Sequence, residues 1–378
     1  MNNDRIEQFQ ILLASHADLA FLPLSADLQY LTGIPREFPS FGAILHPGAW
    51  LEGLWLTPDQ DPIYTLSRMS AEFGGMSTDG DVRILGDWDD PVALVRQVLD
   101  TFKLPPTPRV AFSDNARAET LSQLQTLHPQ MRLVSATAIL RAMRVIKTEA
   151  DIATMRKAGE ITEAVFAAVL KQLKHGMTEL DVMTEVDYQL KRHGAAGPSF
   201  TTAMYNTGPN YPLILGHPEQ KWDRKLEPPM TLLFDFGAIY EGWCYDFGRT
   251  VFFGKPPEAA LRIHRLVMES QKAGIDVLMA GKYTAEDVDA AARKVIEDAG
   301  EGEYFRHRLG HGIGMDVHEP PFLTHGDTTL LQEGMLFTVE PSILHENGFS
   351  ARVEDVVVVR KTGGEKLTFD FQNLIIYE

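Results

Sequence analysis

The chain has a single cysteine, Cys244, among its 378 residues. An internal disulfide is therefore impossible, and this composition is typical of a reducing compartment. Long apolar runs are also missing, so no segment of the sequence can be assigned to a bilayer. The first residues, "MNNDRIEQFQILLASH", mix acids with apolar residues, unlike a secretory signal. We expect a cytoplasmic protein with no membrane partner.

Basic charge is scarce as well. The chain has 35 lysine and arginine residues against 52 aspartate and glutamate residues, which gives a net charge of −17. A surface this acidic repels phosphate backbones, so we expect no nucleic-acid partner. Basic side chains do gather in "RAMRVIK" (Arg141 to Lys147), and we interpret this group as a solvated helix face.

What the chain does contain is enough apolar material for a large core, since 44% of its residues are hydrophobic. Its length favours two domains. Helical and strand-like patterns alternate up to Ser135, which is typical of an α/β domain. Long helical patterns follow from Ala138. The sequence therefore predicts an N-terminal α/β domain over residues 1–137 and a second domain over residues 138–378.

Two segments of the second domain resemble each other. "GMTELDVMTEVDYQLKRHG" begins with Thr178-x-x-Asp181, and "KYTAEDVDAAARKVIEDAG" begins with Thr284-x-x-Asp287, 106 residues later. A threonine three residues before an acid predicts a capped helix start, and the glycine that ends each segment predicts a helix end. The pattern indicates an internal duplication.

The most apolar ribbon of the chain carries two acids. "TLLFDFGAIYEGWCYDFGRTVFFG" is typical of a hairpin, with Asp235 in one strand and Asp246 in the other. A turn at Tyr240-Glu241 would place the two carboxylates directly opposite each other, with Cβ atoms roughly 5 Å apart. Like charges in that position destabilise the ribbon unless a cation binds between them.

The offset of the duplication leads to a second pair of acids in apolar strands, in "MLFTVEPSIL" and "ARVEDVVVV". Asn347-Gly348 between these segments predicts another hairpin. A two-residue turn there would place Asp355 opposite Glu340, whereas a bulge or a longer loop would place Glu354 there. The pattern alone does not choose between Glu354 and Asp355.

Nitrogen ligands lie just ahead of this second hairpin. "HRLGHGIGMDVHEPP" contains His307, His311 and His318 in a glycine-rich, apolar setting, which favours a site over core histidines. Four carboxylates and one imidazole suit Mn²⁺, Co²⁺, Fe²⁺ or Zn²⁺. Two ions about 3.5–4 Å apart would use all four acids, and such a site supplies a hydroxide nucleophile and polarises a carbonyl. The sequence therefore predicts hydrolysis of an amide bond.

The motifs "DFGAIYEGWCYD", "GHGIG", "VEPS" and "RVED" resemble those of the pita-bread metallopeptidases of the creatinase, prolidase and aminopeptidase P type. The resemblance covers the whole chain, because "LQYLTGIP" and "RAMRVIKTEADIATMRKAGEIT" resemble the N-terminal domain and junction of prolidases. It implies an α+β protein. A creatinase-like α/β N-terminal domain would precede a pita-bread catalytic domain with a duplicated α/β half and a curved antiparallel sheet.

By this resemblance the metal ligands are Asp235, Asp246, His311, Glu340 and Glu354. They would hold two divalent ions, with Mn²⁺ the first choice and Co²⁺, Zn²⁺ or Fe²⁺ as alternatives. The implied reaction is hydrolysis of small peptides with proline in second position, above all Xaa-Pro dipeptides, by a hydroxide that bridges the two ions. The resemblance also implies a homodimer.

Other roles follow from the same resemblance. Glu340 would also shuttle the proton to the leaving nitrogen, and His318 would stabilise the tetrahedral intermediate. His217 would lie on the substrate side, His307 would support the ligands, and Arg352 would hold acids and substrate in place.

Four positions depart from the family pattern. The family usually has tyrosine at the position of Leu344, glycine at that of Ser342 and threonine at that of Gly248. Many prolidases have arginine at the position of Phe322. These changes leave two alternatives open: aminopeptidase P activity on longer peptides, and a pita-bread lyase with an altered pocket. A creatinase-like enzyme without metal and a non-catalytic binding module are disfavoured, because all five ligand positions are filled.

Overall fold

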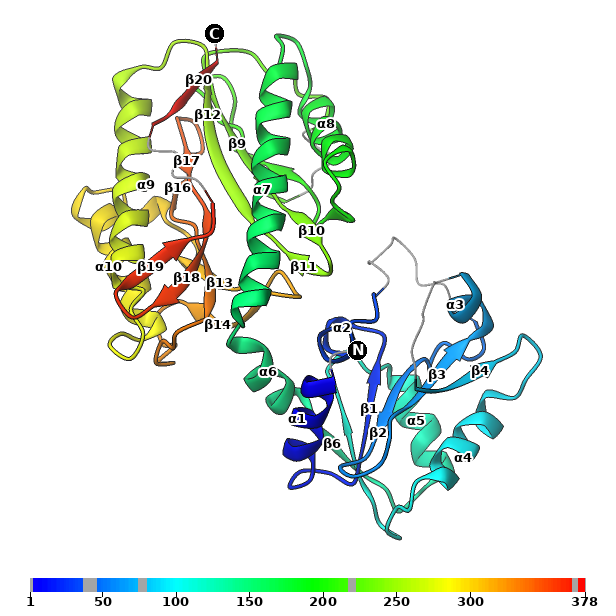
Figure 1. The fold of residues 1–378 in the computed structure, drawn as a ribbon. Coiled ribbons are helices and arrows are strands. Elements are labelled where there is room, and N and C mark those ends of the chain that lie inside the picture. The colour runs from blue at the N-terminus through cyan, green and yellow to red at the C-terminus, as the bar shows by residue number, and fades with distance from the viewer. Residues whose placement is uncertain (1–2, 37–45, 74–79, 217–221, 369–372, 378) are drawn as a thin grey trace. The chain divides into compact units, whose positions relative to one another are not determined.

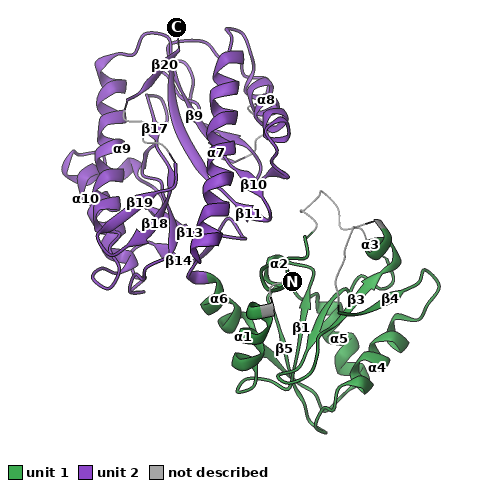
Figure 2. Ribbon diagram, in the orientation of Figure 1, with its two compact units in different colours: residues 1–144 green, residues 145–378 purple. Residues whose placement is uncertain are grey.

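The computed structural model describes residues 3–36, 46–73, 80–216, 222–368 and 373–377. The chain divides into two compact units, residues 1–144 and residues 145–378 (Figure 2). This division falls at the end of helix α6 (Thr137–Val145). The boundary expected from the sequence, between residues 137 and 138, falls at the start of the same helix and stays a prediction.

The first unit is built on a six-stranded mixed sheet with the order β4-β3-β2-β1-β5-β6 (Figure 1). The sheet is mixed because β1, at its centre, pairs antiparallel with β2 and parallel with β5. The strands are β1 (Leu19–Pro23), β2 (Gly53–Leu56), β3 (Ile63–Ser67), β4 (Asp81–Leu85), β5 (Arg109–Phe112) and β6 (Arg132–Ser135).

Helices accompany this sheet because their apolar faces complete its core. Phe21 on β1 packs against Trp55 on β2, with ring centroids 4.3 Å apart, and Val95 and Val98 of α4 belong to the same buried cluster. Asp90 caps α4 by accepting a hydrogen bond from the Val92 amide. The helices of this unit are α1 (Asn3–Leu13), α2 (Ala26–Thr32), α3 (Arg68–Phe73), α4 (Pro91–Thr101) and α5 (Ala118–Leu127), followed by α6.

The second unit repeats one pattern, two helices followed by antiparallel strands (Figure 1). In the first half the elements are α7 (Glu149–Gln172), α8 (Glu179–Arg192), β7 (Gly197–Pro198), β8 (Ala203–Met204), β9 (Met230–Phe236), β10 (Ala238–Tyr240), β11 (Trp243–Cys244) and β12 (Phe247–Phe253). In the second half they are α9 (Glu258–Val277), α10 (Ala285–Asp298), η2 (Gly302–Tyr304), β13 (Gly310–Gly312), β14 (Glu319–Leu323), β15 (Leu336–Val339), β16 (Ser342–Ile343), β17 (Ala351–Arg352), β18 (Asp355–Arg360) and β19 (Gly363–Lys366), before the last strand, β20 (Ile375–Tyr377). Within the described ranges no helix combines the length and the apolar character that crossing a membrane requires.

The matching helix signals of the duplication are present in the structure. Thr178 and Asp181 form a complete capping box at the start of α8, and Thr284 and Asp287 form the same box at the start of α10. The glycines after both helices, Gly194 and Gly300, have φ angles of 91° and 78°, which side chains disfavour. The predicted starts and ends of these two helices are therefore confirmed.

Most strands of the duplicated halves lie in two sheets, and two smaller sheets, β11-β10-β7 and β16-β17, hold the others. One of the two larger sheets has the order β20-β12-β9-β8 and the other β14-β13-β15-β18-β19. A backbone bridge between Gly248 and Glu354 connects β12 to the start of β18, so the two central hairpins lie edge to edge. All seven residues of both β9 and β12 are buried, and β15 is buried throughout. The acids of these strands are thus held in the most apolar part of the unit.

Candidate metal centre

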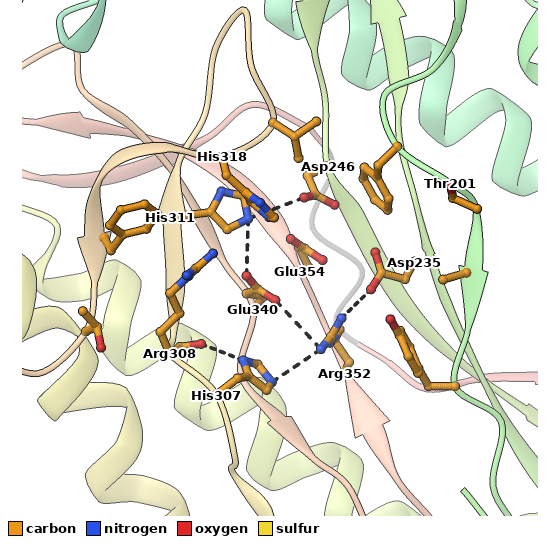
Figure 3. Close-up of a pocket in the computed structure, with 16 residues that line it drawn as sticks. Thr201, Asp235, Asp246, His307, Arg308, His311, His318, Glu340, Arg352 and Glu354 are labelled. Carbon is orange, nitrogen blue, oxygen red and sulfur yellow. Dashed lines mark hydrogen bonds and ion pairs between the residues drawn. The ribbon is translucent and has the colours of Figure 1, made fainter. Parts of the chain in front are cut away.

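Five side chains from both halves of the second unit meet at one cavity of about 680 Å³. Figure 3 shows them pointing toward one another. Asp235 belongs to β9, Asp246 directly precedes β12, and His311 belongs to β13. Glu340 directly follows β15, and Glu354 directly precedes β18. The structure therefore brings together the residues that the family resemblance names as ligands.

The register of the first hairpin differs from the prediction. Asp235 lies opposite Gly248, not opposite Asp246, because the chain turns at Glu241-Gly242 and not at Tyr240-Glu241. Both turn residues have positive φ, 49° and 83°, as a tight two-residue hairpin turn requires. The shift makes the two aspartates diagonal neighbours, which still places them on one face of the ribbon.

The second hairpin places Glu354 opposite Glu340. Val339 pairs with Asp355 on one side of this position and Ser342 pairs with Arg352 on the other, in one continuous register. The connection is longer than a two-residue turn, since the paired strands end at Ile343 and resume at Ala351. The loop length thus resolves the alternative that the sequence pattern left open.

Asp355 faces away from the cavity and is fully buried. It pairs with Arg249, accepts a hydrogen bond from Gln271 Nε2 at 3.0 Å, and lies 3.0 Å from Lys366 Nζ. These cations, Arg249 first, outweigh the effect of burial and lower the pKa of Asp355. Asp355 is therefore a charged anchor behind Glu354.

The donor atoms are close enough for shared cations. Three overlapping groups have ligand atoms within 4.8 Å of one another: Asp246 with His311 and His318, His311 with Glu340 and Glu354, and Asp235 with Asp246 and Glu354. His311 Nε2 lies 3.6 Å from Asp246 Oδ2 and 3.5 Å from Glu340 Oε1. Asp246 Oδ1 is buried without a hydrogen-bond donor. Such an orphaned oxygen fits a metal ligand.

Charge in the cavity is poorly compensated by the protein itself. Burial, followed by repulsion from Asp235, raises the pKa of Asp246, and burial and Asp246 raise that of Glu354. Burial raises the pKa of Glu340 to about 7, although Arg352 opposes this shift. Burial also lowers the pKa of His311 to about 3, so its imidazole is neutral. Crowded carboxylates beside a neutral imidazole fit divalent cations.

Arg352 is the cation that pairs directly with these acids in the described residues. It pairs with Asp235, lies 4.0 Å from Glu340 Oε2, and its Nη2 lies 3.4 Å from His307 Nε2. Burial, followed by the Arg352 charge, lowers the pKa of His307 to about 3. His307 Nδ1 lies 2.6 Å from the Arg308 carbonyl oxygen, so it donates there. Neutral His307 then accepts at Nε2 from Arg352 and from Ser342 Oγ.

His318 lies at the exposed side of the cavity. Its ring meets that of His311 edge to face, with centroids 4.1 Å apart. The next residue, Glu319, is buried and accepts from Lys147 Nζ at 3.1 Å and from the Asp316 amide at 3.1 Å. Lys147 therefore anchors the short segment that carries His318.

Sequence reasoning placed some residues wrongly and missed others. Lys147 is buried, and Arg144 is buried in an ion pair with Asp27, so the interpretation of this basic group as a solvated face is wrong for both. Arg308, which lines the cavity, was not predicted, because the signal for a site in this segment came from its histidines and arginine is not a metal ligand. His217 lies outside the described residues.

Besides Ser342, whose hydroxyl contacts His307, the other three departures from the family pattern also have visible neighbours. Phe322 lines the cavity, and Leu344 is buried with its amide donating to the Tyr304 carbonyl oxygen at 3.1 Å. A Cβ atom added at Gly248 would lie 2.9 Å from Glu354 Cβ and from Glu354 Oε2. Glycine at this position therefore permits the close approach of the two hairpins.

Comparisons with known proteins agree with this architecture. Residues 153–361 match the model of metallopeptidase family M24, and residues 5–146 match the creatinase/prolidase N-terminal domain. The Xaa-Pro dipeptidase of Lactobacillus delbrueckii subsp. lactis is 31% identical over 381 residues, which cover 99% of this chain and 98% of the relative. The chain belongs to metallopeptidase family M24.

Solved structures of similar proteins cover the chain from end to end. The prolidase of Thermococcus sibiricus has 28% identity and a TM-score of 0.85, with 100% of this chain and 99% of that chain covered. The X-Pro aminopeptidase of Thermotoga maritima has 25% identity and a TM-score of 0.84, with 97% and 99% covered. The predicted family and the two-domain pita-bread fold are confirmed, and the protein is a metallopeptidase.

Proposed function

We propose that the protein hydrolyses Xaa-Pro dipeptides in a metal-dependent reaction. The observation that carries this proposal is the convergence of four buried carboxylates and one neutral imidazole on a single cavity. The substrate class is supported by the full-length likeness to an Xaa-Pro dipeptidase and to a solved prolidase. A second candidate is release of the first residue from longer Xaa-Pro peptides, which the likeness to an X-Pro aminopeptidase favours.

The residues that would hold the metal are Asp235, Asp246, His311, Glu340 and Glu354. Two divalent ions would use this donor set, with Mn²⁺ first and Co²⁺, Zn²⁺ or Fe²⁺ as alternatives. When bound, such ions would polarise the scissile carbonyl and, by lowering the pKa of a water molecule, would supply a hydroxide nucleophile at neutral pH. The overlap of the three ligand groups supports two ions rather than one.

Glu340 would move the proton. Its carboxylate, which lies beside His311 and Arg352 in the cavity, would take a proton from the attacking water and return it to the leaving proline nitrogen. Arg352 would hold Asp235 and Glu340 in position, and neutral His307 would fix Arg352 through its Nε2 acceptor. The exposed His318 would donate a hydrogen bond to the oxygen that gains charge in the transition state.

Further parts of the prediction concern the whole chain. A creatinase-like domain over residues 1–137, a catalytic domain over residues 138–378, a homodimer and a cytoplasmic location remain predictions from the sequence. So does a role for His217 on the substrate side. The net charge of −17 and the single cysteine support the expected location and the absence of a nucleic-acid partner.

The test is an activity assay on two substrates. The metal-free protein, prepared with a chelator, is loaded with Mn²⁺ or Zn²⁺ and given Ala-Pro or Ala-Pro-Ala. We expect cleavage of Ala-Pro that depends on added metal and exceeds cleavage of the tripeptide. The reverse preference would support the aminopeptidase, and no metal-dependent cleavage of either substrate would refute the proposal.

A further inference from the structure

Arg308 is a second cation of the cavity, and it differs from Arg352 in its partners. It directly precedes Leu309 and β13, and its side chain lines the cavity beside the candidate ligands. Figure 3 shows this side chain extending toward His311. After burial, the nearby Arg308 charge is the next cause that lowers the pKa of His318. The guanidinium group is therefore close to the reaction site.

No carboxylate of the described residues pairs with Arg308. Its Nε is buried and has no hydrogen-bond acceptor. The contact that holds the group is aromatic, since Arg308 Cζ lies 4.6 Å from the centroid of the Phe322 ring. Arg352, by contrast, pairs directly with Asp235. Four acids line the same cavity, yet none of these four forms a direct ion pair with Arg308, whose charge acts on Glu340 only from a greater distance.

The chemistry of this group selects what could bind there. A guanidinium remains charged at any physiological pH, and its planar set of N–H donors matches both oxygens of a carboxylate. A buried donor without an acceptor destabilises the protein, so an incoming carboxylate would gain more at this place than at an exposed arginine. The stacked Phe322 ring limits the motion of the guanidinium, which reduces the entropy lost on binding.

A dipeptide carries one carboxylate of its own, at its second residue. Its amino terminus is positive and would be attracted to the acids of the metal centre, away from Arg308. A dipeptide in the cavity therefore places its two ends at groups of opposite charge.

We infer that Arg308 binds the α-carboxylate of the substrate's second residue and so selects dipeptides over longer peptides, in which that group is an amide. The inference rests on the proposed function and extends it to a specificity-determining residue. Phe322 holds the guanidinium in position. The five ligand residues would hold the metal ions at the scissile bond, while Arg308 fixes the far end of the substrate.

The test compares Ala-Pro with its C-terminal amide, Ala-prolinamide, on the Mn²⁺-loaded full-length protein. A hydrogen bond to a charged group changes affinity by about 10- to 100-fold, so we expect the wild type to favour the free acid by that factor in kcat/KM. Arg308→Gln should lose most of this preference through a higher KM for Ala-Pro, with a much smaller change on the amide. Arg308→Lys, which keeps the charge without the planar fork, should retain part of it.

Arg306→Gln is the matched control. Arg306 lies in the same segment and is exposed, 3.4 Å from Glu346, so its loss should leave the preference for the free acid unchanged. Circular dichroism checks that each variant folds. If Arg308→Gln does not fold, the test is the preference for Ala-Pro over Ala-prolinamide in the wild type and in Arg308→Lys.

Two results would overturn the inference. One is a wild type that cleaves both substrates equally well, and the other is an Arg308→Gln variant that loses the same factor on both. Absence of metal-dependent cleavage of either substrate by the wild type would overturn the proposed function and this inference with it.

Discussion

Lys147 and Glu319 form a buried ion pair that joins the start of the second unit to the segment carrying His318. Their side chains are 2% and 8% exposed, and Lys147 Nζ lies 3.1 Å from Glu319 Oε2. At this distance the Coulomb attraction is about 5 kcal/mol for an effective dielectric constant of about 20, before the cost of desolvation. Removal of one partner leaves a buried charge, which costs about 3–5 kcal/mol.

The perturbation is a double-mutant cycle with Lys147→Met, Glu319→Gln and the double variant. We expect Lys147→Met to lower the free energy of unfolding by about 3–5 kcal/mol, and the double variant to recover part of that loss, with a coupling energy of about 2–3 kcal/mol. Urea denaturation of the folded, metal-free protein measures both quantities. Each single variant should also lose kcat on Ala-Pro, because His318 follows directly along the anchored segment.

The matched control is Lys272→Met. Lys272 Nζ lies close to Asp276 in an exposed ion pair, with side chains 74% and 58% exposed. Surface pairs of this kind contribute at most about 1 kcal/mol. If Lys147→Met destabilised the protein no more than Lys272→Met, or if the two single effects simply added, the anchoring role of the pair would be refuted.

Three further predictions concern the same unit. Glu340→Gln should keep the fold and lower kcat by at least about 100-fold, since it removes the proton-transfer group, and wild-type rates would contradict this role. Gly248→Ala should lower the affinity for Mn²⁺, measured by calorimetry, because the new Cβ would lie 2.9 Å from Glu354; unchanged affinity would show that Glu354 moves freely. Burial, aided by Arg249, lowers the pKa of His264 to about 4 from 6.5. A folded-state pKa below the unfolded one contributes stability above about pH 6.5 that is lost as the pH falls toward 4. When the pH is lowered from 7.5 to 5, the free energy of unfolding should therefore fall by about 2 kcal/mol less in His264→Gln than in the wild type. An equal fall in both proteins would refute this assignment.

Local signals predicted the helices of the second unit well. The threonine and acid at the starts of α8 and α10 satisfy backbone amides within one turn, so the sequence contains all that the cap needs. The long helical patterns expected from Ala138 onward likewise include α7 (Glu149–Gln172). Features that depend only on neighbours in the chain were therefore predictable.

Register was predicted less well, because it depends on the geometry of the turn. Glu241 adopts a positive φ that few residues other than glycine tolerate, and no local pattern gave this away. The shift moved Asp235 from its predicted partner to Gly248. In the second hairpin the length of the loop decided between Glu354 and Asp355, and a pattern of acids in strands does not contain that length.

Pairs distant in the chain were not predictable at all. Lys147 meets Glu319 across 172 residues, and Arg144 meets Asp27 across 117. Lys147 and Arg144 both belong to the same basic group in the sequence, and only the fold distinguishes a solvated basic side chain from a buried one. That no carboxylate in the described part of the chain forms an ion pair with Arg308 is likewise a property of the folded cavity.

The bridge between Gly248 and Glu354 has a thermodynamic consequence. It is the seam where two copies of one motif touch, and each copy brings only part of the donor set: two aspartates on one side, a histidine and two glutamates on the other. An ion bound by ligands from both halves would stabilise their contact. The free energy of unfolding should therefore rise with the logarithm of the free metal concentration. Depletion of the metal would then lower the stability of the second unit as well as abolish its activity.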